Sequence, residues 1–287
     1  MPRFASPQKQ LAGRRVLITG AARGIGAALA ARLHQRGARL ALAGLEPDLL
    51  AEVAAGCGDA PWVECDIADP AATERAVATL TEQLGGLDIA VANAGIAKQL
   101  PLLGGDAAAF ERMLRVNALG TYHTVRAAGP YVSHPDGYVL LIASLAAAVH
   151  LPLLGAYSAS KAAVEALGNT LRTELYATGA RVGVGYFAEL DTEMTSRGFG
   201  TRAAAVLTGG GSLTRTTPLG TAVDALERGI TRRSRRIVAP WWVAPLLPVR
   251  MGAQRLVEVR ARRRLPEALA IARTEDVPFT TDQPAQP

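Results

Sequence analysis

The stretch "RRVLITGAARGIG" (residues 14–26) decides the fold of this chain. Its first half is apolar and β-branched and ends in a glycine, which is typical of a buried strand. The second half opens a segment with helical periodicity. Gly20 permits a tight turn, Gly24 lets the backbone approach a pyrophosphate, and Gly26 allows the helix to pack closely on the strand. The pattern predicts a phosphate-binding loop at a helix N-terminus, with a purely structural turn as the alternative.

The alternation of strand and helix continues along the chain. The apolar runs that we interpret as strands lie at residues 14–20, 38–44, 61–66, 87–95, 137–144, 181–187 and 235–240. Helical segments separate most of them, including 25–37, 70–85, 106–130 and 157–178. Strands that alternate with helices predict a parallel sheet covered on both faces. We therefore expect an α/β fold, a single Rossmann-type doubly wound domain of about seven strands over residues 11–245. A basic, partly helical extension (246–287) follows it.

The charge of the chain is unevenly distributed. The 287 residues carry a formal net charge of +6, yet residues 228–264 hold eleven arginines and one acid, Glu258. That segment contributes about +10, so the rest of the chain is mildly acidic at about −4. Basicity confined to one segment argues against a protein that binds nucleic acid with its whole surface. We expect no nucleic-acid partner.

Cysteine content and apolar runs indicate the compartment. Cys57 and Cys65 are too few for a disulfide framework or a metal-binding cluster, so we expect no metal site. The first ten residues lack the apolar stretch of a secretory signal. The longest apolar run (237–249) is too short to span a bilayer and contains three prolines. The expected location is the cytoplasm.

A tyrosine and a lysine stand four positions apart in "YSASK" (157–161), within a predicted helix. Residues at this spacing share a helical face, so the ammonium of Lys161 can lie near the phenol of Tyr157. A nearby cation favours phenolate and lowers the pKa of a tyrosine toward the range of an acid/base catalyst. Taken alone the pattern is weak, because it arises by chance in many helices.

Further motifs, in order along the chain, strengthen the interpretation of Tyr157 and Lys161 as a catalytic pair. They are "TGAARGIG" (19–26), "CDIAD" (65–69), "ANAG" (92–95), "VNALG" (116–120), "IAS" (142–144) and "YSASK" (157–161). Together they resemble the short-chain dehydrogenase/reductase family over roughly residues 14–195. Ala92 departs from that family's pattern, which has an asparagine there.

The resemblance implies an oxidoreductase that transfers a hydride between a nicotinamide cofactor and an alcohol or carbonyl. It implies that Tyr157 is the general acid/base, that Lys161 lowers its pKa and holds the nicotinamide ribose, and that Ser144 binds the substrate oxygen. Asn117 would shape a helix kink and anchor a water in the proton relay. The catalytic set is thus Asn117, Ser144, Tyr157 and Lys161. The implied cofactor-binding residues are Gly20, Ala22, Arg23, Gly24, Ile25, Gly26, Gly44, Asp66, Ile67, Asn93, Ala94, Gly95, Tyr157, Lys161, Leu190 and Thr192.

Two departures from the family pattern bear on the cofactor. After the strand at 181–187 the family has Pro-Gly, where this chain has Phe187 and Ala188 but keeps Thr192. At the end of the second strand Gly44 replaces the acid that would bind the adenosine ribose and repel a 2′-phosphate. With Arg23 in the glycine loop, this favours NADP over NAD, although Glu46 argues for NAD.

The candidate substrate pocket is mostly apolar, which favours a hydrophobic secondary alcohol or ketone. Its predicted residues are Leu145, Val149, His150, Phe187, Glu189 and Met194. The glycine run at 209–211 resembles a hinge beneath a mobile lid, with a plain loop as the alternative. A second class of function, a cofactor-binding regulator or scaffold without catalysis, also stays open.

Two surfaces suggest partners. Residues 241–264 combine tryptophans, leucines and arginines, so they either pack on the domain or lie on an anionic membrane surface. We favour packing, because apolar stripes mostly become core.

The helices at 106–130 and 157–178 carry apolar faces that, by the family resemblance, pair across a two-fold axis. We expect a homodimer or homotetramer.

Overall fold

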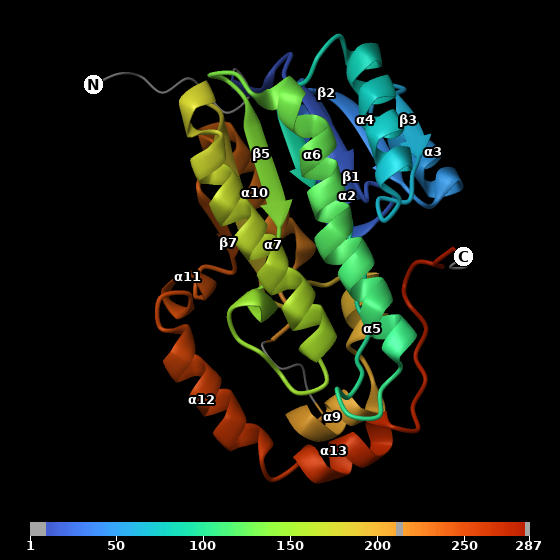
Figure 1. The fold of residues 1–287 in the computed structure, drawn as a ribbon, viewed down its shortest axis with the longest axis vertical. Helices are drawn as coiled ribbons and strands as arrows, with labels where there is room; N and C mark the ends of the chain where they lie inside the picture. Colours follow the sequence, from blue (N-terminus) through green and yellow to red (C-terminus); the bar gives the residue numbers. More distant parts are fainter. Residues whose placement is uncertain (1–9, 211–214, 285–287) are drawn as a thin grey trace.

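Seven parallel strands form the central sheet, in the order β3-β2-β1-β4-β5-β6-β7 (Figure 1). This computed structural model describes residues 10–210 and 215–284. The strands are β1 (Arg15–Thr19), β2 (Arg39–Gly44), β3 (Trp62–Glu64), β4 (Ile89–Ala92), β5 (Tyr138–Ile142), β6 (Arg181–Phe187) and β7 (Arg236–Ala239). All seven lie within or at the runs expected from the sequence. The predicted doubly wound parallel sheet is confirmed.

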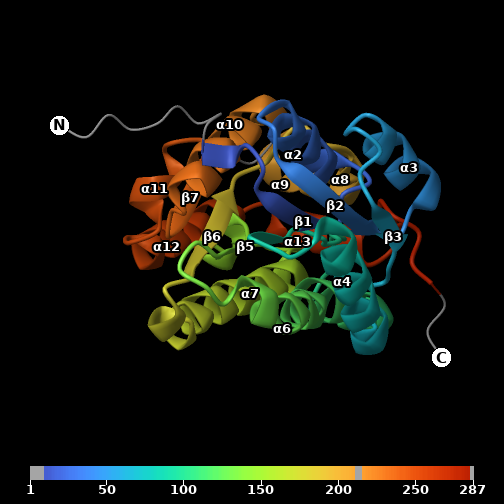
Figure 2. The ribbon, with the colours of Figure 1, turned by 90° about the horizontal axis from the view of Figure 1, so that it is seen from above.

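Helices cover the sheet on both faces (Figure 2). One face carries α2 (Gly24–Gln35), α3 (Pro47–Ala55) and α10 (Leu219–Arg232). The other carries α4 (Pro70–Leu84), α5 (Ala107–Leu114), α6 (Gly120–Val132) and α7 (Gly155–Glu174). Strands enclosed in this way bury the side chains of both their faces, which is why β4 and β5 are apolar and buried at every position.

The strand order reverses between β1 and β4, and one asparagine joins the two strands there. Asn93 Nδ2 donates to the carbonyl oxygens of Thr19 and Gly20, both at 3.0 Å. The Thr19 hydroxyl accepts in return from the backbone N–H of Asn93 at 3.2 Å. In open α/β sheets, ligands bind outside the carboxyl ends of the strands at such a reversal. This junction therefore marks the place to look for a functional site.

After β7 the chain crosses the carboxyl edge of the sheet instead of ending there (Figure 1). It forms α11 (Val243–Leu246), α12 (Arg250–Ala261) and α13 (Leu265–Ala272). Helix α13 packs against α9 (Arg202–Thr208), which follows α8 (Glu193–Gly198). Ala253 and Val257 of α12 contact the main core cluster. The division into a domain (11–245) and an extension (246–287) stays a prediction, and residues 285–287 lie outside the described residues.

The glycine run lies at the end of α9. Gly209 ends that helix with a φ of 75°, and Gly210 follows with a φ of 91°, both in the region that favours glycine. Gly211 lies outside the described residues, so the hinge stays a prediction.

Among the described residues, no helix is both long and apolar enough to cross a membrane.

Replacing Gly26 by alanine should destabilise the whole domain, because the added Cβ would collide with the carbonyl oxygen of Gly20 and lie 2.8 Å from Asn93 Nδ2. A clash with backbone costs roughly 2–4 kcal/mol in the free energy of unfolding. Denaturant unfolding of the variant measures that loss. The control is Gly220→Ala in α10, where an added Cβ meets nothing within 4 Å, so its stability should equal or exceed that of the wild type. Equal stability of the two variants would contradict the expected packing.

Candidate active site

A cavity of about 800 Å³ lies at the carboxyl edge of the sheet, and it gathers most of the residues singled out from the sequence. Its walls come from the glycine loop, the segments after β2 to β6, helix α7 and the C-terminal segment. The sequence-predicted residues that line it are Gly20, Ala22, Arg23, Gly24, Ile25, Gly44, Asp66, Ile67, Asn93, Ala94, Gly95, Ser144, Leu145, Val149, Tyr157, Lys161, Phe187, Glu189, Leu190, Thr192 and Met194.

Three residues of the predicted set do not line this cavity. Gly26 lies behind the loop, against the carbonyl of Gly20. Asn117 is fully buried beneath the cavity wall. His150 is exposed, and its backbone N–H donates to Gln254 Oε1 at 2.8 Å. Val149 points into the cavity and His150 away from it, so the assignment of His150 to the pocket is corrected.

The glycine loop presents an open N-terminus of α2 to the cavity. Gly20 and Gly24 have φ angles of 64° and 55°, which a side chain would strain. A Cβ on Gly24 would meet nothing within 4 Å, so the space above the loop is free. The helix has no side-chain cap and no acid in its first turn. Unpaired N–H groups at the positive end of the helix dipole are suited to bind a phosphate.

Tyr157 lies in the cavity wall and is almost wholly enclosed. Its ring meets that of Phe199, beyond α8, edge to face at 5.4 Å between centroids. Burial raises the pKa of Tyr157 to about 12, and a hydrogen bond with Ser144 opposes that shift. Burial therefore dominates the pKa of Tyr157 in this structure, and the lowering by Lys161 expected from the sequence stays a prediction. A phenol removed from water stays protonated because burial penalises the phenolate.

Lys161 lies near the Tyr157 ring and also bonds to the backbone at the end of β5. Its Nζ donates to the backbone carbonyl of Ile142 at 2.9 Å and lies 5.8 Å from the centre of the Tyr157 ring. Burial lowers the pKa of Lys161 to about 8. The ammonium is thus held at the end of β5, close to Gly95. It is not bonded to the phenol oxygen.

Asn117 acts on the site from behind. Its side chain bridges the backbone of Ile96, accepting from the N–H at 2.8 Å and donating to the carbonyl at 2.9 Å. It also donates to Ser160 Oγ, at 2.9 Å, on helix α7. The helix is π-helical over Arg115–Leu119, between α5 and α6, as the expected kink implies. Asn117 therefore ties the loop after β4 to the helix that carries Tyr157.

Charged pairs line the other end of the cavity. Arg23 pairs with Glu46, beyond β2, through Nε at 2.9 Å and through a second, shorter contact, and with Glu193 at the start of α8. Asp66 pairs with Arg112 of α5 at 2.7 Å. The sequence analysis treated Arg23 as an available cation, whereas here two carboxylates hold it.

The loop after β6 follows the sheet further than the family pattern implied. Phe187 is the last residue of β6 and pairs with Ala239 of β7. The N–H of Ala188 then donates to the carbonyl of Ala239 at 3.0 Å. Thr192 caps α8, and its hydroxyl accepts from the N–H of Thr195 at 3.4 Å. The replacement of Pro-Gly by Phe187 and Ala188 thus leaves Leu190 and Thr192 at the cavity.

The sequence analysis missed the wall that the C-terminal segment provides. Side chains on one face of α12 and of the turn that follows it line the cavity, and they recur at helical spacing. The last of them are Arg260 and Arg264. Ala253, Val257 and Ala261, each four residues apart, were the available signal. The further lining residues that were not foreseen include Leu151, Pro152, Leu154, Phe199, Leu207, Trp242, Leu246, Leu256, Thr280, Thr281 and Gln283.

Comparison with known proteins places this site in a family. Residues 14–202 match the family model for short chain dehydrogenases. An uncharacterised oxidoreductase of Mycobacterium tuberculosis is 30% identical over 82% of this chain and 91% of its own length. The chain belongs to the short-chain dehydrogenase family. As in that family generally, it is an oxidoreductase that depends on a nicotinamide cofactor.

Other relatives span the same region. A hydroxysteroid 11-beta-dehydrogenase 1-like protein of Gallus gallus is 29% identical over 83% of this chain and 82% of its own length. A Sinorhizobium meliloti dehydrogenase/reductase structure has a TM-score of 0.71 and 28% identity, over 82% of this chain and 98% of its own. A short-chain dehydrogenase/reductase from Burkholderia phymatum, solved with NAD, shares the fold with a TM-score of 0.76 and 21% identity. The match covers 86% of this chain and 96% of the other.

The cavity fits the dinucleotide of the short-chain dehydrogenases. The open helix N-terminus and the free space above Gly24 suit a pyrophosphate. Asp66 and Ile67 lie at the β3 end of the cavity, and Lys161 lies at the end nearer β5. The residues present therefore offer contacts along the whole length of such a cofactor.

Proposed function

We propose that the protein transfers a hydride between a nicotinamide cofactor and a hydrophobic secondary alcohol or its ketone, with Tyr157 as the general acid/base. The observation that carries the proposal is the position of Ser144, Tyr157 and Lys161 on one wall of the cavity that the glycine loop also lines. A scaffold without catalysis would not need a buried phenol, a buried ammonium and a half-buried hydroxyl to converge there.

Each side chain then has a distinct task. The nicotinamide, when bound, supplies or accepts the hydride. Tyr157 gives its proton to the carbonyl oxygen during reduction, which suits a phenol that burial keeps protonated. Ser144, which lines the same cavity, holds the same substrate oxygen. Lys161, whose ammonium lies 5.8 Å from the ring centre, stabilises the phenolate that the proton transfer leaves. Asn117 acts as a positioning residue.

The nature of the substrate is inferred from the walls around Tyr157. Leu145 and Val149 follow β5, Met194 and Phe199 come from α8 and its end, and Trp242 belongs to the C-terminal segment. These side chains offer apolar surface, and burial of apolar area contributes about 25 cal/mol per Å² to binding. A bulky hydrophobic alcohol or ketone fits such walls better than a small polar metabolite.

Replacing Tyr157 by phenylalanine should abolish turnover and leave cofactor affinity within about twofold of the wild type, because only the proton donor is lost. Lys161→Ala should lower both the rate and cofactor affinity. Cofactor oxidation at 340 nm with a panel of hydrophobic ketones measures the rates, and fluorescence titration measures the affinities. Full activity of the Tyr157→Phe variant with any good substrate would refute the role of Tyr157, and no activity of the wild type on the whole panel would favour the scaffold.

For the cofactor we propose NAD in preference to NADP, which departs from the expectation drawn from Gly44 and Arg23. The support comes from charge. The guanidinium of Arg23, the cation expected to meet a 2′-phosphate, is engaged by Glu46 and Glu193. One cation between two carboxylates leaves a net negative cluster, which repels a phosphate. A carboxylate near the end of β2 also suits a ribose 2′-hydroxyl.

Replacing Glu46 by glutamine should shift the preference toward NADP, because it removes one of the two carboxylates that hold Arg23 and one negative charge. We expect the ratio of NADPH to NADH dissociation constants to fall by about tenfold, or about 1.4 kcal/mol. Titration of both cofactors into wild type and variant measures that ratio. Glu52→Gln on α3 is the control, since Glu52 does not line the cavity. A wild-type preference for NADPH would overturn the proposal.

We also propose that the chain forms a homodimer or homotetramer through α6 and α7. Leu119 and Tyr122, at the start of α6, are 50% and 45% exposed, so apolar surface remains uncovered there.

Light scattering at micromolar concentration should show an oligomer, and Tyr122→Arg should shift it toward monomer. Tyr176→Arg changes a side chain that is 85% exposed beyond the end of α7 and serves as the control. A monomeric wild type would contradict the proposal.

A further inference from the structure

The chain beyond α13 is anchored to the body by specific contacts. We call residues 274–284 the C-terminal tail. The carboxylate of Glu275 accepts from the backbone N–H groups of Arg202 and Ala203, at 2.8 and 3.1 Å, at the start of α9. Asp276 pairs with Lys98 at 2.8 Å, and the Lys98 Nζ lies 5.7 Å from the ring centre of Phe279. The tail therefore follows a defined path past the loop after β4.

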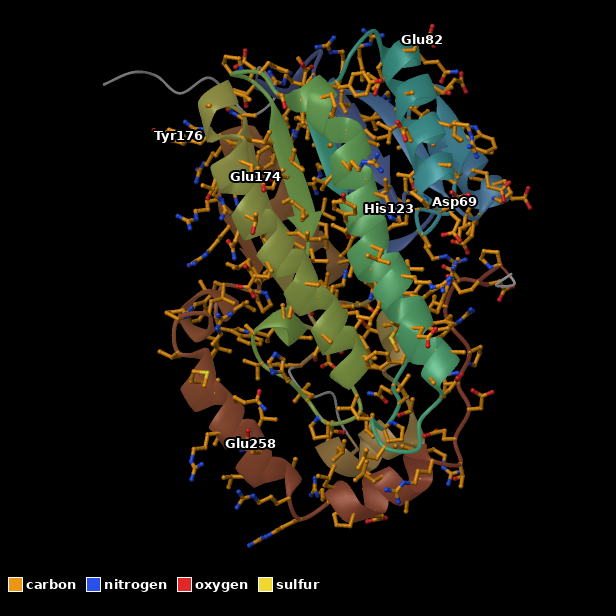
Figure 3. The ribbon with its side chains drawn as sticks, viewed as in Figure 1. Asp69, Glu82, His123, Glu174, Tyr176 and Glu258 are labelled. Carbon is orange, nitrogen blue, oxygen red and sulfur yellow. The ribbon has the colours of Figure 1, made fainter. Side chains whose placement is uncertain are left out.

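The end of the tail reaches the part of the cavity beside β2 and β3. Figure 1 shows it passing α5 toward β3, the side on which Asp69 is labelled in Figure 3. Thr281 Oγ1 lies 3.4 Å from Glu46 Oε2. Arg112, which pairs with Asp66, donates from Nε to Gln283 Oε1 at 2.9 Å. Two side chains of the tail thus contact the charged pairs that line this end of the cavity.

Between Phe279 and Thr281 stands a hydroxyl without a partner. Thr280 is 8% exposed and lines the cavity. Its Oγ1 is buried and makes no hydrogen bond with any described residue. A buried hydroxyl left unpaired costs free energy, so most such groups have a partner. The oxygen itself has almost no accessible surface, but Thr280 lines the cavity, so rotation about its Cα–Cβ bond would bring the hydroxyl to a ligand there.

We propose that the C-terminal tail is part of the cofactor site, and that the Thr280 hydroxyl hydrogen-bonds the adenosine half of the dinucleotide. This rests on the proposed function, which places a nicotinamide cofactor in the cavity. The adenosine half is the part concerned because Thr281 and Gln283 contact Glu46 and the Asp66–Arg112 pair, at the ends of β2 and β3. The tail forms a wall of the open cavity, so it encloses a bound cofactor rather than displacing it.

The sharpest test removes one hydroxyl. Thr280→Val keeps the shape of the side chain and deletes the hydrogen bond. We expect the dissociation constants of NADH and of 5′-AMP to rise by roughly 3- to 10-fold. The melting temperature of the variant without cofactor should equal or exceed that of the wild type, because a buried unpaired hydroxyl has been removed. Calorimetric titration and thermal melting give the two quantities, and neither depends on turnover.

Thr81→Val is the matched control. Thr81, in α4, is 4% exposed, its Oγ1 also lacks a partner, and it does not line the cavity. This variant should raise the melting temperature in the same way and leave both dissociation constants unchanged. A chain ended after Phe279 is the second probe. It keeps the contacts of Glu275, Asp276 and Phe279, and it should bind NADH more weakly and release it faster.

The outcomes separate the possible failures. Wild-type affinity in the Thr280→Val variant, as in the Thr81→Val control, would overturn the hydrogen bond to the cofactor. Tighter binding by the shortened chain would overturn the enclosing role and make the tail an inhibitory plug. If the wild-type protein binds neither NADH nor NADPH, the proposed function itself fails, whatever the behaviour of the variants.

Discussion

The hydrogen bonds from Asn93 to Thr19 and Gly20 hold together the point on which the rest of the structure depends. They join the ends of β1 and β4, the neighbouring strands at which the strand order reverses. Space there is limiting. A Cβ on Gly20 would lie 2.6 Å from Ala94 Cα, and one on Gly26 would strike the Gly20 carbonyl. Three short segments can meet so closely only because these positions carry no side chain. The open N-terminus of α2 is a direct result.

The catalytic wall depends on burial more than on paired charges. Removal from water raises the pKa of Tyr157 to about 12 and lowers that of Lys161 to about 8, so both groups are shifted toward their neutral forms. Such a pair suits the proton donor of the proposed mechanism. In that mechanism the charge left on the phenol would form in a site of low polarity, where a neighbouring ammonium acts strongly.

Much of the fold was predictable because its signals are local. The strands follow apolar runs, and the glycine loop and the Tyr157–Lys161 pair are defined within a few residues. What escaped prediction depends on partners distant in sequence. Arg23 meets Glu193, and Thr281 meets Glu46, only after the sheet brings their segments together. His150 was assigned to the pocket by its place after Val149, but it is exposed and bonds to Gln254, which is 104 residues away in the sequence. The C-terminal stripe was noticed as apolar, but the sequence did not say what it would face.

The stripe on α12 forms a wall of the cavity that is not built from the sheet or its covering helices. Ala253, Val257 and Arg260 line the cavity, yet they belong to a helix that follows the last strand. They lie outside both the sheet and the glycine loop, where Gly20 and Gly26 have no room for a side chain. The cavity is thus walled partly by the sheet edge and partly by a helix that is not part of it. Under the proposed function, substitutions on that one helix would change which substrates fit while Ser144, Tyr157 and Lys161 keep their places.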